Sequence, residues 1–399
     1  MGGVVRPDVA LVSPYPAPGR THDGTSGVAS YTANLARALS SQGASVLVVA
    51  PDEPNAPSSH SDAGVGIVRC GPRGPLALTR AIRWAADRRP GVIHLQHEAF
   101  LFGGLSSMAT LPMAMLLLRG RAAATTVHQV VDPEVIGPEF MAMHRLHGPT
   151  MTVRAAINAY QRVLAAAGVT IVHEPGFLAH LPDSVVIPHG VERRTGPPRA
   201  EARQRLGLSD ESRLVVLCFG FVAPYKGLEI ALAAAGDVPE VLIVVAGGDH
   251  PRHGAMYVET LTRRWGDLAR FTGWVPEEDI SFWHRAADLA LFAYPAPHSS
   301  SGAVAMAFAH GTPILTSEEL GRCMGLPSDS SVSLAGRELA ERLRKLAGDR
   351  DSLAELRRVS TAMGGGRSWP EVAKLHLRLY DRIVSDAIAP GELGQLEVV

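Results

Sequence analysis

The chain has 399 residues, of which 46% are hydrophobic and 19% charged, as expected for two globular domains with sizeable cores. Its formal net charge is −1 at pH 7, which excludes the strongly basic face that a nucleic-acid-binding protein uses to neutralise phosphates. Three cysteines, Cys70, Cys218 and Cys323, lie far apart and lack the spacing of a zinc site or a disulfide framework, which favours a reducing compartment.

The N-terminal segment lacks the charged start, long apolar centre and cleavage site of a signal peptide. The longest apolar stretch, Leu105–Leu118, is shorter than the ~20 residues that a helix needs to cross a bilayer. We therefore expect a cytoplasmic protein with at most peripheral membrane contact. Nothing in the sequence specifies its oligomeric state.

Short β-type apolar runs alternate with helical patterns along most of the chain. Many runs are apolar throughout, as expected when helices cover both faces of a parallel sheet. In the first half the strand candidates are Val9–Val12, Val46–Ala50, Val92–Leu95, Ala123–His128, Val169–His173 and Val185–Pro188. In the second half they are Arg213–Gly220, Glu240–Ala246, Leu289–Ala293 and Pro313–Leu315. With amphipathic segments such as Gly27–Ser41, Leu228–Ala235 and Pro276–Ala287 between them, this order predicts two facing doubly wound, Rossmann-like α/β domains.

A segment rich in proline and charge, Glu192–Arg199, predicts a linker near the middle of the chain. It would join an N-terminal domain at residues 1–192 to a C-terminal domain at residues 200–368. Ligands bind at the carboxyl ends of the strands in open α/β sheets, so we expect a cleft between the two domains.

Three further segments have distinctive composition. Asp52–Gly66 is polar and rich in Ser and Pro, and predicts a surface loop. The GGGRS segment predicts a flexible joint before a C-terminal helix at residues 369–387, and the residues beyond that helix predict a frayed tail.

A glycine-containing loop, His22–Val28, follows the first strand and precedes a helix. Gly27 would let the backbone approach a ligand, and the helix start offers unpaired N–H groups to an anion or hydroxyl. An ordinary βα loop is the alternative.

The FGFVAPYKG segment follows a strong strand and opens a helix. Lys226 at this position can neutralise a diphosphate leaving group, and Gly220 would let the backbone approach it. A solvated lysine is disfavoured because a cation at a helix start opposes the helix dipole. Gly248, in the AGGD segment after the next strand, predicts either a tight turn or a backbone contact with the nucleotide.

A Ser- and Gly-rich loop after Tyr294 leads into a helix that ends at Gly311. Three hydroxyl groups beside a helix N-terminus predict a phosphate site, with a Ser-rich helix cap as the alternative. The predicted donor contacts are His298, Ser299, Ser300, Ser301, Gly302 and Ala303.

In the first half, polar residues stand where strands are predicted to end. Gln96, His97 and Glu98 follow one strand and are candidates for substrate contact, while His128 ends the next. A single histidine is more often structural than functional, but a place at a strand end favours a role in the cleft.

In this order the segments resemble the family 4 glycosyltransferases, which are retaining enzymes of the GT-B fold. GVASYTANLARAL is similar to the family's N-terminal glycine loop and helix, and HLQHEAFLFGG and TTVH match one branch of the family. IPHGV, FGFVAPYKG, FTGWVPEEDI and AHGTPILT extend the resemblance over nearly the whole chain.

The resemblance implies that His128 contacts the transferred sugar, that Lys226 binds the donor diphosphate, and that the backbone around Gly302 meets the phosphates. It implies a C-terminal helix that crosses back onto the first domain. The co-substrate would be a nucleotide sugar, a UDP-sugar before a GDP-, ADP- or dTDP-sugar, with no cofactor and no metal site. The acceptor would be a small molecule or a glycan.

Two departures from the family pattern concern the donor site. Phe221 stands where many members have an arginine, and His298 and Met306 stand where many have two glutamates. Neither His nor Met can do the work of a carboxylate, so the identity of the donor and the usual ribose contact are in question.

The leading hypothesis is metal-independent glycosyl transfer with retention. There are two alternatives: an isomerase that uses Glu98 as a base, and a donor-binding relative without catalysis. A helical stretch at Pro138–Ala167 either lines the acceptor side or is a core-facing helix with a solvated basic face. The high Ala, Gly and Arg content suggests a bacterial source, in which glycosylation of a secondary metabolite or glycan is plausible.

Overall fold

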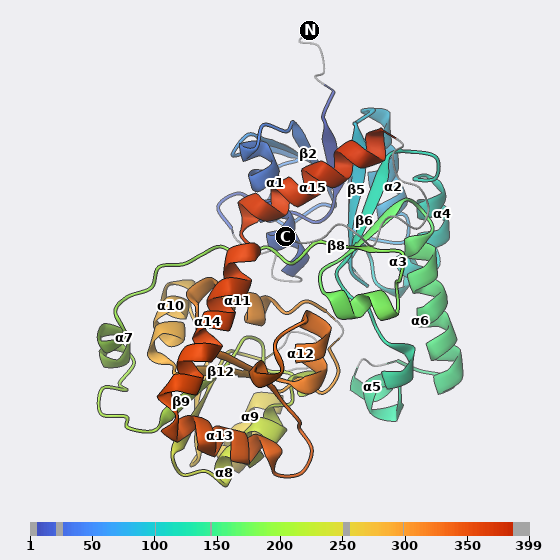
Figure 1. Cartoon of the computed structure of the whole chain (residues 1–399). Helices are drawn as coiled ribbons and strands as arrows, with labels where there is room; N and C mark the ends of the chain where they lie inside the picture. Colours follow the sequence, from blue (N-terminus) through green and yellow to red (C-terminus); the bar gives the residue numbers. More distant parts are fainter. Residues whose placement is uncertain are drawn as a thin grey trace.

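The computed structural model describes residues 6–20, 27–99, 101–143, 146–249, 256–297 and 299–385. They form two α/β domains, each built on its own sheet, with the first domain at the top of Figure 1 and the second below it. The segment 192–198 passes from one to the other without a helix or strand.

The first sheet has eight strands in the order β3-β4-β2-β1-β5-β6-β7-β8. All neighbours are parallel except β3 and β4. The strands are β1 (Val9–Val12), β2 (Val46–Ala50), β3 (Ser59–Asp62), β4 (Val65–Arg69), β5 (Val92–His97), β6 (Ala123–Val127), β7 (Val169–Val172) and β8 (Val185–Val186). Every residue of β1, β5 and β6 is buried. β1 is accordingly a continuous apolar run, whereas β5 also buries the polar side chains of His94, Gln96 and His97.

The second sheet is parallel and has six strands in the order β11-β10-β9-β12-β13-β14. The strands are β9 (Leu214–Phe219), β10 (Val241–Ala246), β11 (Ala269–Gly273), β12 (Leu289–Phe292), β13 (Ile314–Ser317) and β14 (Ser331–Val332). The expectation of two doubly wound domains is confirmed.

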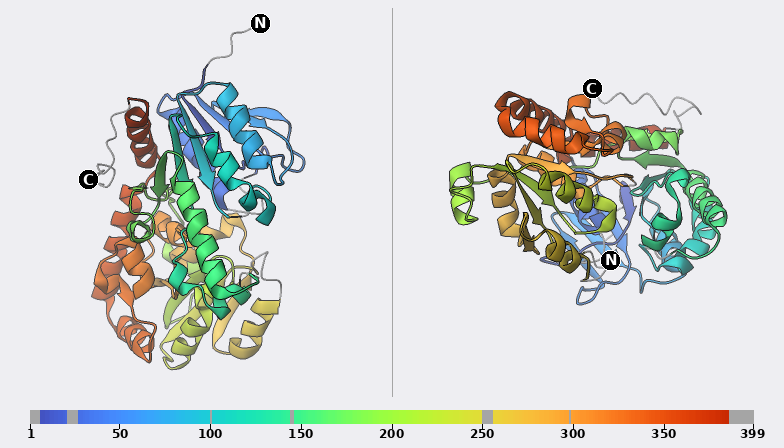
Figure 2. Two further views of the ribbon diagram at one scale, coloured as in Figure 1. Left: turned by 90° about the vertical axis from the view of Figure 1, so that its right-hand side faces the viewer. Right: turned by 90° about the horizontal axis from the view of Figure 1, so that it is seen from below.

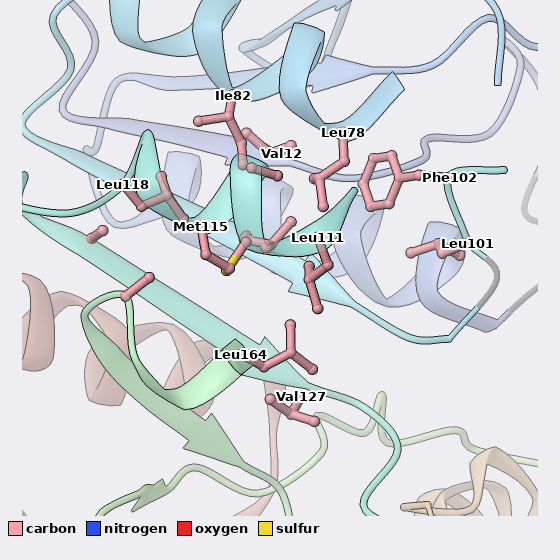
Figure 3. Packing of buried hydrophobic residues seen from close by; sticks show 14 of the residues in the cluster. Val12, Leu78, Ile82, Leu101, Phe102, Leu111, Met115, Leu118, Val127 and Leu164 are labelled. Carbon is pink, nitrogen blue, oxygen red and sulfur yellow. The ribbon is translucent and has the colours of Figure 1, made fainter. Parts of the chain in front are cut away.

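Helices cover both faces of each sheet. In the first domain they are α1 (Gly27–Ser41), α2 (Ala77–Asp87), α3 (Leu105–Ala109), α4 (Leu111–Leu116), α5 (Pro138–Met143) and α6 (Thr150–Ala165). In the second they are α7 (Arg199–Arg205), α8 (Leu228–Gly236), α9 (Met256–Trp265), α10 (Glu277–Ala286), α11 (Gly302–His310), α12 (Glu318–Met324), α13 (Glu338–Gly348) and α14 (Arg350–Gly366). Figure 3 shows the core of the first domain, in which side chains of α2 and α4 pack over the sheet.

The last helix, α15 (Trp369–Val384), leaves the second domain and packs on the first, as the resemblance implied. It buries Val372, Ala373, Leu379 and Tyr380 in the cluster that includes the inner face of α1. In Figures 1 and 2 it is the dark red helix that lies against the upper domain. The residues of the predicted tail from 386 onward lie outside the described residues.

The predicted surface loop at Asp52–Gly66 is wrong in part, because it contains the edge strand β3. β3 pairs with β4 through a tight turn in which Ala63 and Gly64 both have positive φ, of 48° and 84°. The strand reads SHSD and has no apolar residue, so hydrophobic patterning could not reveal it.

The predicted flexible joint at GGGRS is also wrong, because α14 continues through Gly366. A Cβ on Gly364 would lie only 2.7 Å from the carbonyl oxygen of Phe308 in α11. The glycine therefore allows two helices to cross at close range.

The predicted helical stretch at Pro138–Ala167 is divided into α5 and α6, since Gly148, with a φ of 114°, and Pro149 interrupt it. Of α6, only Gln161 and Leu164 are buried, while Val153 and Ile157 are partly buried against the small cluster of Val131, Ile136 and Met141. No helix in the described part of the chain combines the length and the hydropathy needed to cross a membrane.

Candidate functional site

Three elements of the second domain converge beside Gly220, where the chain leaves β9 with a φ of 99°. A Cβ on Gly220 would lie 2.9 Å from the Nζ of Lys226 and 3.1 Å from the Cβ of Ala303. Lys226 ends the short 3-10 helix η3 (Pro224–Lys226), and Ala303 belongs to the first turn of α11. The structure thus brings together the glycine, the lysine and the helix start that the sequence analysis singled out separately.

The ammonium group of Lys226 is buried among apolar and aromatic groups, and the residue is 9% exposed. Burial lowers its pKa from 10.5 to about 8, against a smaller opposing effect of the Cys218 thiol. The Nζ lies 5.9 Å from the centre of the Tyr294 ring. No carboxylate forms an ion pair with it within the described residues, so an anionic ligand would supply the missing counter-charge.

The first turn of α11 presents backbone N–H groups at the same place. Ser301 caps the helix: its hydroxyl accepts from the Val304 N–H at 3.4 Å and lies 3.1 Å from the Tyr294 hydroxyl. The N–H groups of Gly302 and Ala303 have no partner inside a helix, because they precede the first hydrogen-bonded turn. They and the helix dipole favour an anion beside Lys226.

Two of the three hydroxyl groups in the predicted phosphate site make contacts within the protein. Ser300 donates its hydroxyl to the carboxylate of Glu174, and Ser301 is the helix cap. Ser299 forms an isolated backbone bridge with Gln129 of the first domain. The hydroxyls of Ser300 and Ser301 are thus engaged with protein groups, whereas the first N–H groups of α11 have no helical partner. His298 lies outside the described residues.

The loop after β10 supports the interpretation of Gly248 as part of a tight turn. Its carbonyl accepts from the Val222 N–H at 2.8 Å, and a Cβ on the preceding Gly247 would lie 2.1 Å from the carbonyl oxygen of Gly220. Phe221 and Trp274 flank this turn with ring centroids 5.9 Å apart, and they are 40% and 68% exposed. Aromatic surface therefore stands at the edge of the site, at the position where the resemblance implied an arginine.

In the first domain, Gln96 and His97 lie within β5 rather than after it, and Glu98 follows directly. His97 is buried, and its pKa is lowered to about 3 by desolvation. The Tyr160 hydroxyl of α6 lies 3.2 Å from its Nδ1. His97 is thus a neutral ring held inside the domain, whereas Glu98 is half-buried.

His128 directly follows β6 and is linked to protein groups through both ring nitrogens. Its Nε2 lies 2.8 Å from the Gln96 amide, and its Nδ1 lies 3.2 Å from the Nε2 of His173. The Nδ1 of His173 lies 2.9 Å from the carbonyl oxygen of Ile187 and must donate to it. Burial, reinforced by neighbouring histidines, holds the pKa of both rings well below the ordinary value, so both are neutral.

Neutrality fixes the protons of this chain of groups. Because His173 donates through Nδ1, its Nε2 must accept from His128, and the Nε2 of His128 must then accept from Gln96. The oxygen and nitrogen of a side-chain amide are distinguished only by their hydrogen-bond partners. The Gln96 amide is therefore assigned with its NH2 group toward His128 and its oxygen toward the Nε2 of His94. The Nδ1 of His94 in turn accepts from the Tyr380 hydroxyl of α15 at 2.6 Å.

The two halves of the site meet directly. The Gln129–Ser299 bridge places the residue after His128 against the loop before α11, and Glu174, after β7, reaches Ser300 of the same loop. Sequence reasoning missed Glu174 and its partner Arg367. The only available signal for Glu174 was a carboxylate just past the end of a strand.

The remaining residues of the predicted site are not part of the group formed by Gly220, Lys226 and the start of α11. Gly27 is the exposed first residue of α1, and the rest of the predicted His22–Ser26 loop lies outside the described residues. Met306 is half-buried on α11, and its carbonyl accepts from the Nδ1 of His310. Within the described residues, no group of three or more His, Cys, Asp or Glu side chains is arranged to hold a metal ion.

Comparison with known proteins agrees with this geometry. Residues 25–195 match the family model described as Glycosyltransferase Family 4. The 2-deoxystreptamine glucosyltransferase of Streptomyces kanamyceticus is 28% identical over 77% of this chain and 81% of its own length. A GDP-mannose-dependent phosphatidylinositol monomannoside mannosyltransferase of Mycolicibacterium smegmatis is 29% identical, over about half of each chain (51% and 52%).

Solved structures share the whole fold. Sucrose-phosphate synthase of Thermosynechococcus elongatus superposes with a TM-score of 0.73 at 21% identity, over 95% of this chain and 99% of the other. Anabaena HepE, in its complex with UDP-glucose, gives a TM-score of 0.65 at 16% identity, over 94% and 99%. The family match over residues 25–195, the relatives and the two-domain fold agree in their similarity to the family 4 glycosyltransferases.

Proposed function

We propose that this glycosyltransferase moves a sugar from a nucleotide-sugar donor to an acceptor hydroxyl with retention of the anomeric configuration. The observation that supports this most directly is the convergence of Lys226, Gly220 and the start of α11. A buried ammonium with a depressed pKa and a helix N-terminus together favour a diphosphate over a neutral ligand.

The chemistry would depend on the leaving group. As the bond between the anomeric carbon and the diphosphate oxygen breaks, Lys226 and the N–H groups of α11 stabilise the charge that develops on the diphosphate. The acceptor hydroxyl forms the new bond on the same face of the sugar and gives its proton to a diphosphate oxygen. This route needs neither a metal ion nor the pair of carboxylates on which glycoside hydrolases depend.

His128 would form part of the wall of the sugar site. Both of its ring nitrogens are bonded within the protein, so we infer that it meets the sugar through the edge of its ring rather than through a donated hydrogen bond. Gln96 holds the ring in place, and Glu98, next to it in sequence and only half-buried, is the better candidate for a polar contact with the acceptor.

For the donor we propose a UDP-sugar first, since the related fold of HepE is known in complex with UDP and UDP-glucose. For the acceptor we propose a small polyhydroxylated molecule or a glycan. The relative matched over most of the chain is named for transfer of glucose to 2-deoxystreptamine, which has this chemistry.

Thermal unfolding with a panel of UDP-, GDP-, ADP- and dTDP-sugars tests the proposal, because a ligand that binds only the native state raises the melting temperature. We expect one nucleotide series to stabilise the protein and Lys226→Ala to abolish the effect. Lys374→Ala is the matched control, since this lysine is half-exposed on α15 and pairs with Glu371. Equal stabilisation of the Lys226→Ala variant would exclude the proposed diphosphate site.

Two further candidate functions differ from transfer in their products, and the first follows from Met306, a side chain on α11 that offers no carboxylate. A donor-binding protein without transferase activity would bind the nucleotide sugar but yield no product with any acceptor. An isomerase that used Glu98 as its base would convert the donor without an acceptor. Product analysis by mass spectrometry and NMR, with and without an acceptor panel, separates both from glycosyl transfer.

A further inference from the structure

A buried ion pair joins the two domains at the candidate site. Glu174 follows β7 in the first domain, and Arg367 stands between α14 and α15. The two guanidinium nitrogens Nη1 and Nη2 donate to the two carboxylate oxygens, each at 2.9 Å. The same carboxylate accepts the hydroxyl of Ser300, from the loop that precedes α11. One carboxylate thus holds the crossing between the last two helices and the loop beside the proposed diphosphate site.

This arrangement is enclosed and specific. The Glu174 and Arg367 side chains are 1% and 9% exposed, so neither is solvated by bulk water. A buried charge requires a partner, and the bidentate geometry satisfies both oxygens of the carboxylate. The bond from Ser300 is therefore an addition to a pair that is already complete.

Neighbouring contacts hold the same interface. η2 (Pro175–Ala179), directly after Glu174, packs on α12 so closely that a Cβ on Gly176 would lie 2.6 Å from the Cα of Cys323. On the other side, Ser299 forms its backbone bridge with Gln129. Two adjacent residues of the loop before α11 are thus held by the first domain, although the loop belongs to the second.

We propose that Glu174 is a positioning residue for the diphosphate site, an inference that rests on the proposed function. Held by Arg367, it fixes Ser300 and through it the N-terminus of α11, so that the N–H groups of Gly302 and Ala303 point at the site. Glu174 acts through Ser300, which does not bind the phosphates itself. Diphosphate binding in one domain is therefore coupled to the contact between the two.

Linkage makes the coupling reciprocal. If the docked arrangement binds diphosphate more tightly than an undocked one, then bound diphosphate strengthens the docking by the same factor. A nucleotide would therefore tighten the Glu174–Ser300 contact and slow amide exchange in the first turn of α11. A loop that bound phosphate independently of the first domain would show no such dependence.

A double-mutant cycle tests the inference, with UDP and inorganic pyrophosphate as the titrants in calorimetry. Ser300→Ala removes the loop side of the contact. The paired replacement Glu174→Met with Arg367→Met removes the other side without leaving a buried charge alone, a change that is often neutral for stability. Ser300→Thr keeps the hydroxyl and is the matched control, and thermal unfolding verifies that each variant is folded.

We expect Ser300→Ala and the paired replacement each to raise the Kd of UDP about tenfold, with no further rise when they are combined. The KM for the donor should rise while kcat at saturating donor stays unchanged, and Ser300→Thr should behave as wild type. Additive losses, or a full loss from Ser300→Ala beside a neutral paired replacement, would show direct binding by Ser300 and overturn the inference.

These experiments distinguish a failure of the positioning role of Glu174 from a failure of the proposed function. If the wild type and Lys226→Ala bind UDP and pyrophosphate equally, the diphosphate site itself is wrong and the inference falls with it. If Lys226→Ala loses binding while the Ser300 and Glu174/Arg367 variants keep it, the site stands and the positioning role alone is refuted.

Discussion

His128 and His173 meet ring to ring at the carboxyl ends of β6 and β7, with the Nδ1 of one 3.2 Å from the Nε2 of the other. They belong to a set of buried histidines that continues through His94 to His376 on α15. Each ring has its pKa lowered chiefly by desolvation, and for His376 the pKa falls from 6.5 to about 4. The folded protein therefore contains these rings in the neutral form.

This set predicts loss of stability in mild acid. The folded pKa lies below the unfolded one, so below pH 6.5 the unfolded chain binds protons that the folded chain rejects. Stability should be independent of these rings above pH 6.5. It should fall on acidification, by up to about 1.4 kcal/mol per pH unit for each ring.

Denaturant unfolding between pH 7.5 and pH 5 measures this slope. His376→Phe, which keeps a ring between His94 and Tyr380, should reduce the slope by up to one proton over the window from pH 6.5 to about 4. An unfolding free energy that stayed constant down to pH 5 would contradict the neutral assignment, and with it the orientation given to Gln96.

The titration of the Lys226 ammonium group provides a second test, which concerns ligand binding rather than stability. The chain contains only three lysines, so 13C reductive methylation of a Lys345→Arg, Lys374→Arg variant leaves Lys226 as the one labelled side chain. Its resonance should titrate near pH 8 in the free protein. Bound UDP should raise that pKa, because the charged form gains an anionic partner.

The sign of the pKa change has a consequence for binding. Between the free and bound pKa values, binding takes up a proton, so the affinity for UDP should decline as the pH rises above about 8. Calorimetry at pH 8.5 in buffers of different ionisation enthalpy counts the proton. A resonance that titrated at the ordinary 10.5, and did not move with UDP, would show that Lys226 does not line the diphosphate site.

Local patterns in the sequence were enough to predict the alternation of strands and helices, because fully buried strands such as β10 are continuous apolar runs. They also led to Lys226, since a lysine at a helix start opposes the helix dipole and has few purely structural reasons to be there. They could not lead to Glu174 and Arg367, which are separated by 193 residues. Such a pair follows from how two domains dock, and no spacing along the chain encodes it.

Glycines at the site should respond to substitution according to the space around them. Gly220→Ala places a Cβ 2.9 Å from the Nζ of Lys226 in a left-handed conformation, so it should destabilise the protein by about 1–3 kcal/mol and displace the ammonium. Gly302→Ala meets no atom within 4 Å and should leave the melting temperature unchanged or raise it.

Gly302→Ala is the more informative variant, because it should not lower the stability of the protein. If the space beside Gly302 is where the diphosphate lies, Gly302→Ala should weaken UDP binding in calorimetry without loss of stability. Gly236→Ala, at the end of α8 and with only ordinary van der Waals contact at 3.6 Å, is the matched control. Unchanged UDP binding by Gly302→Ala would place the anion elsewhere.

Alanine substitutions in the run of three glycines that ends α14 distinguish the effect of packing on stability from the effect of helix propensity. Alanine is favoured over glycine inside a helix by about 1 kcal/mol, so Gly365→Ala and Gly366→Ala, whose added Cβ atoms meet nothing within 4 Å, should stabilise the protein. Gly364→Ala gains the same propensity but forces a Cβ to 2.7 Å from the Phe308 carbonyl oxygen, so it should destabilise by about 1–3 kcal/mol. Chemical unfolding of the three variants measures both effects. If the segment were a flexible joint, all three substitutions would have nearly the same effect on stability. A loss of stability confined to Gly364→Ala requires that α14 and α11 cross in contact.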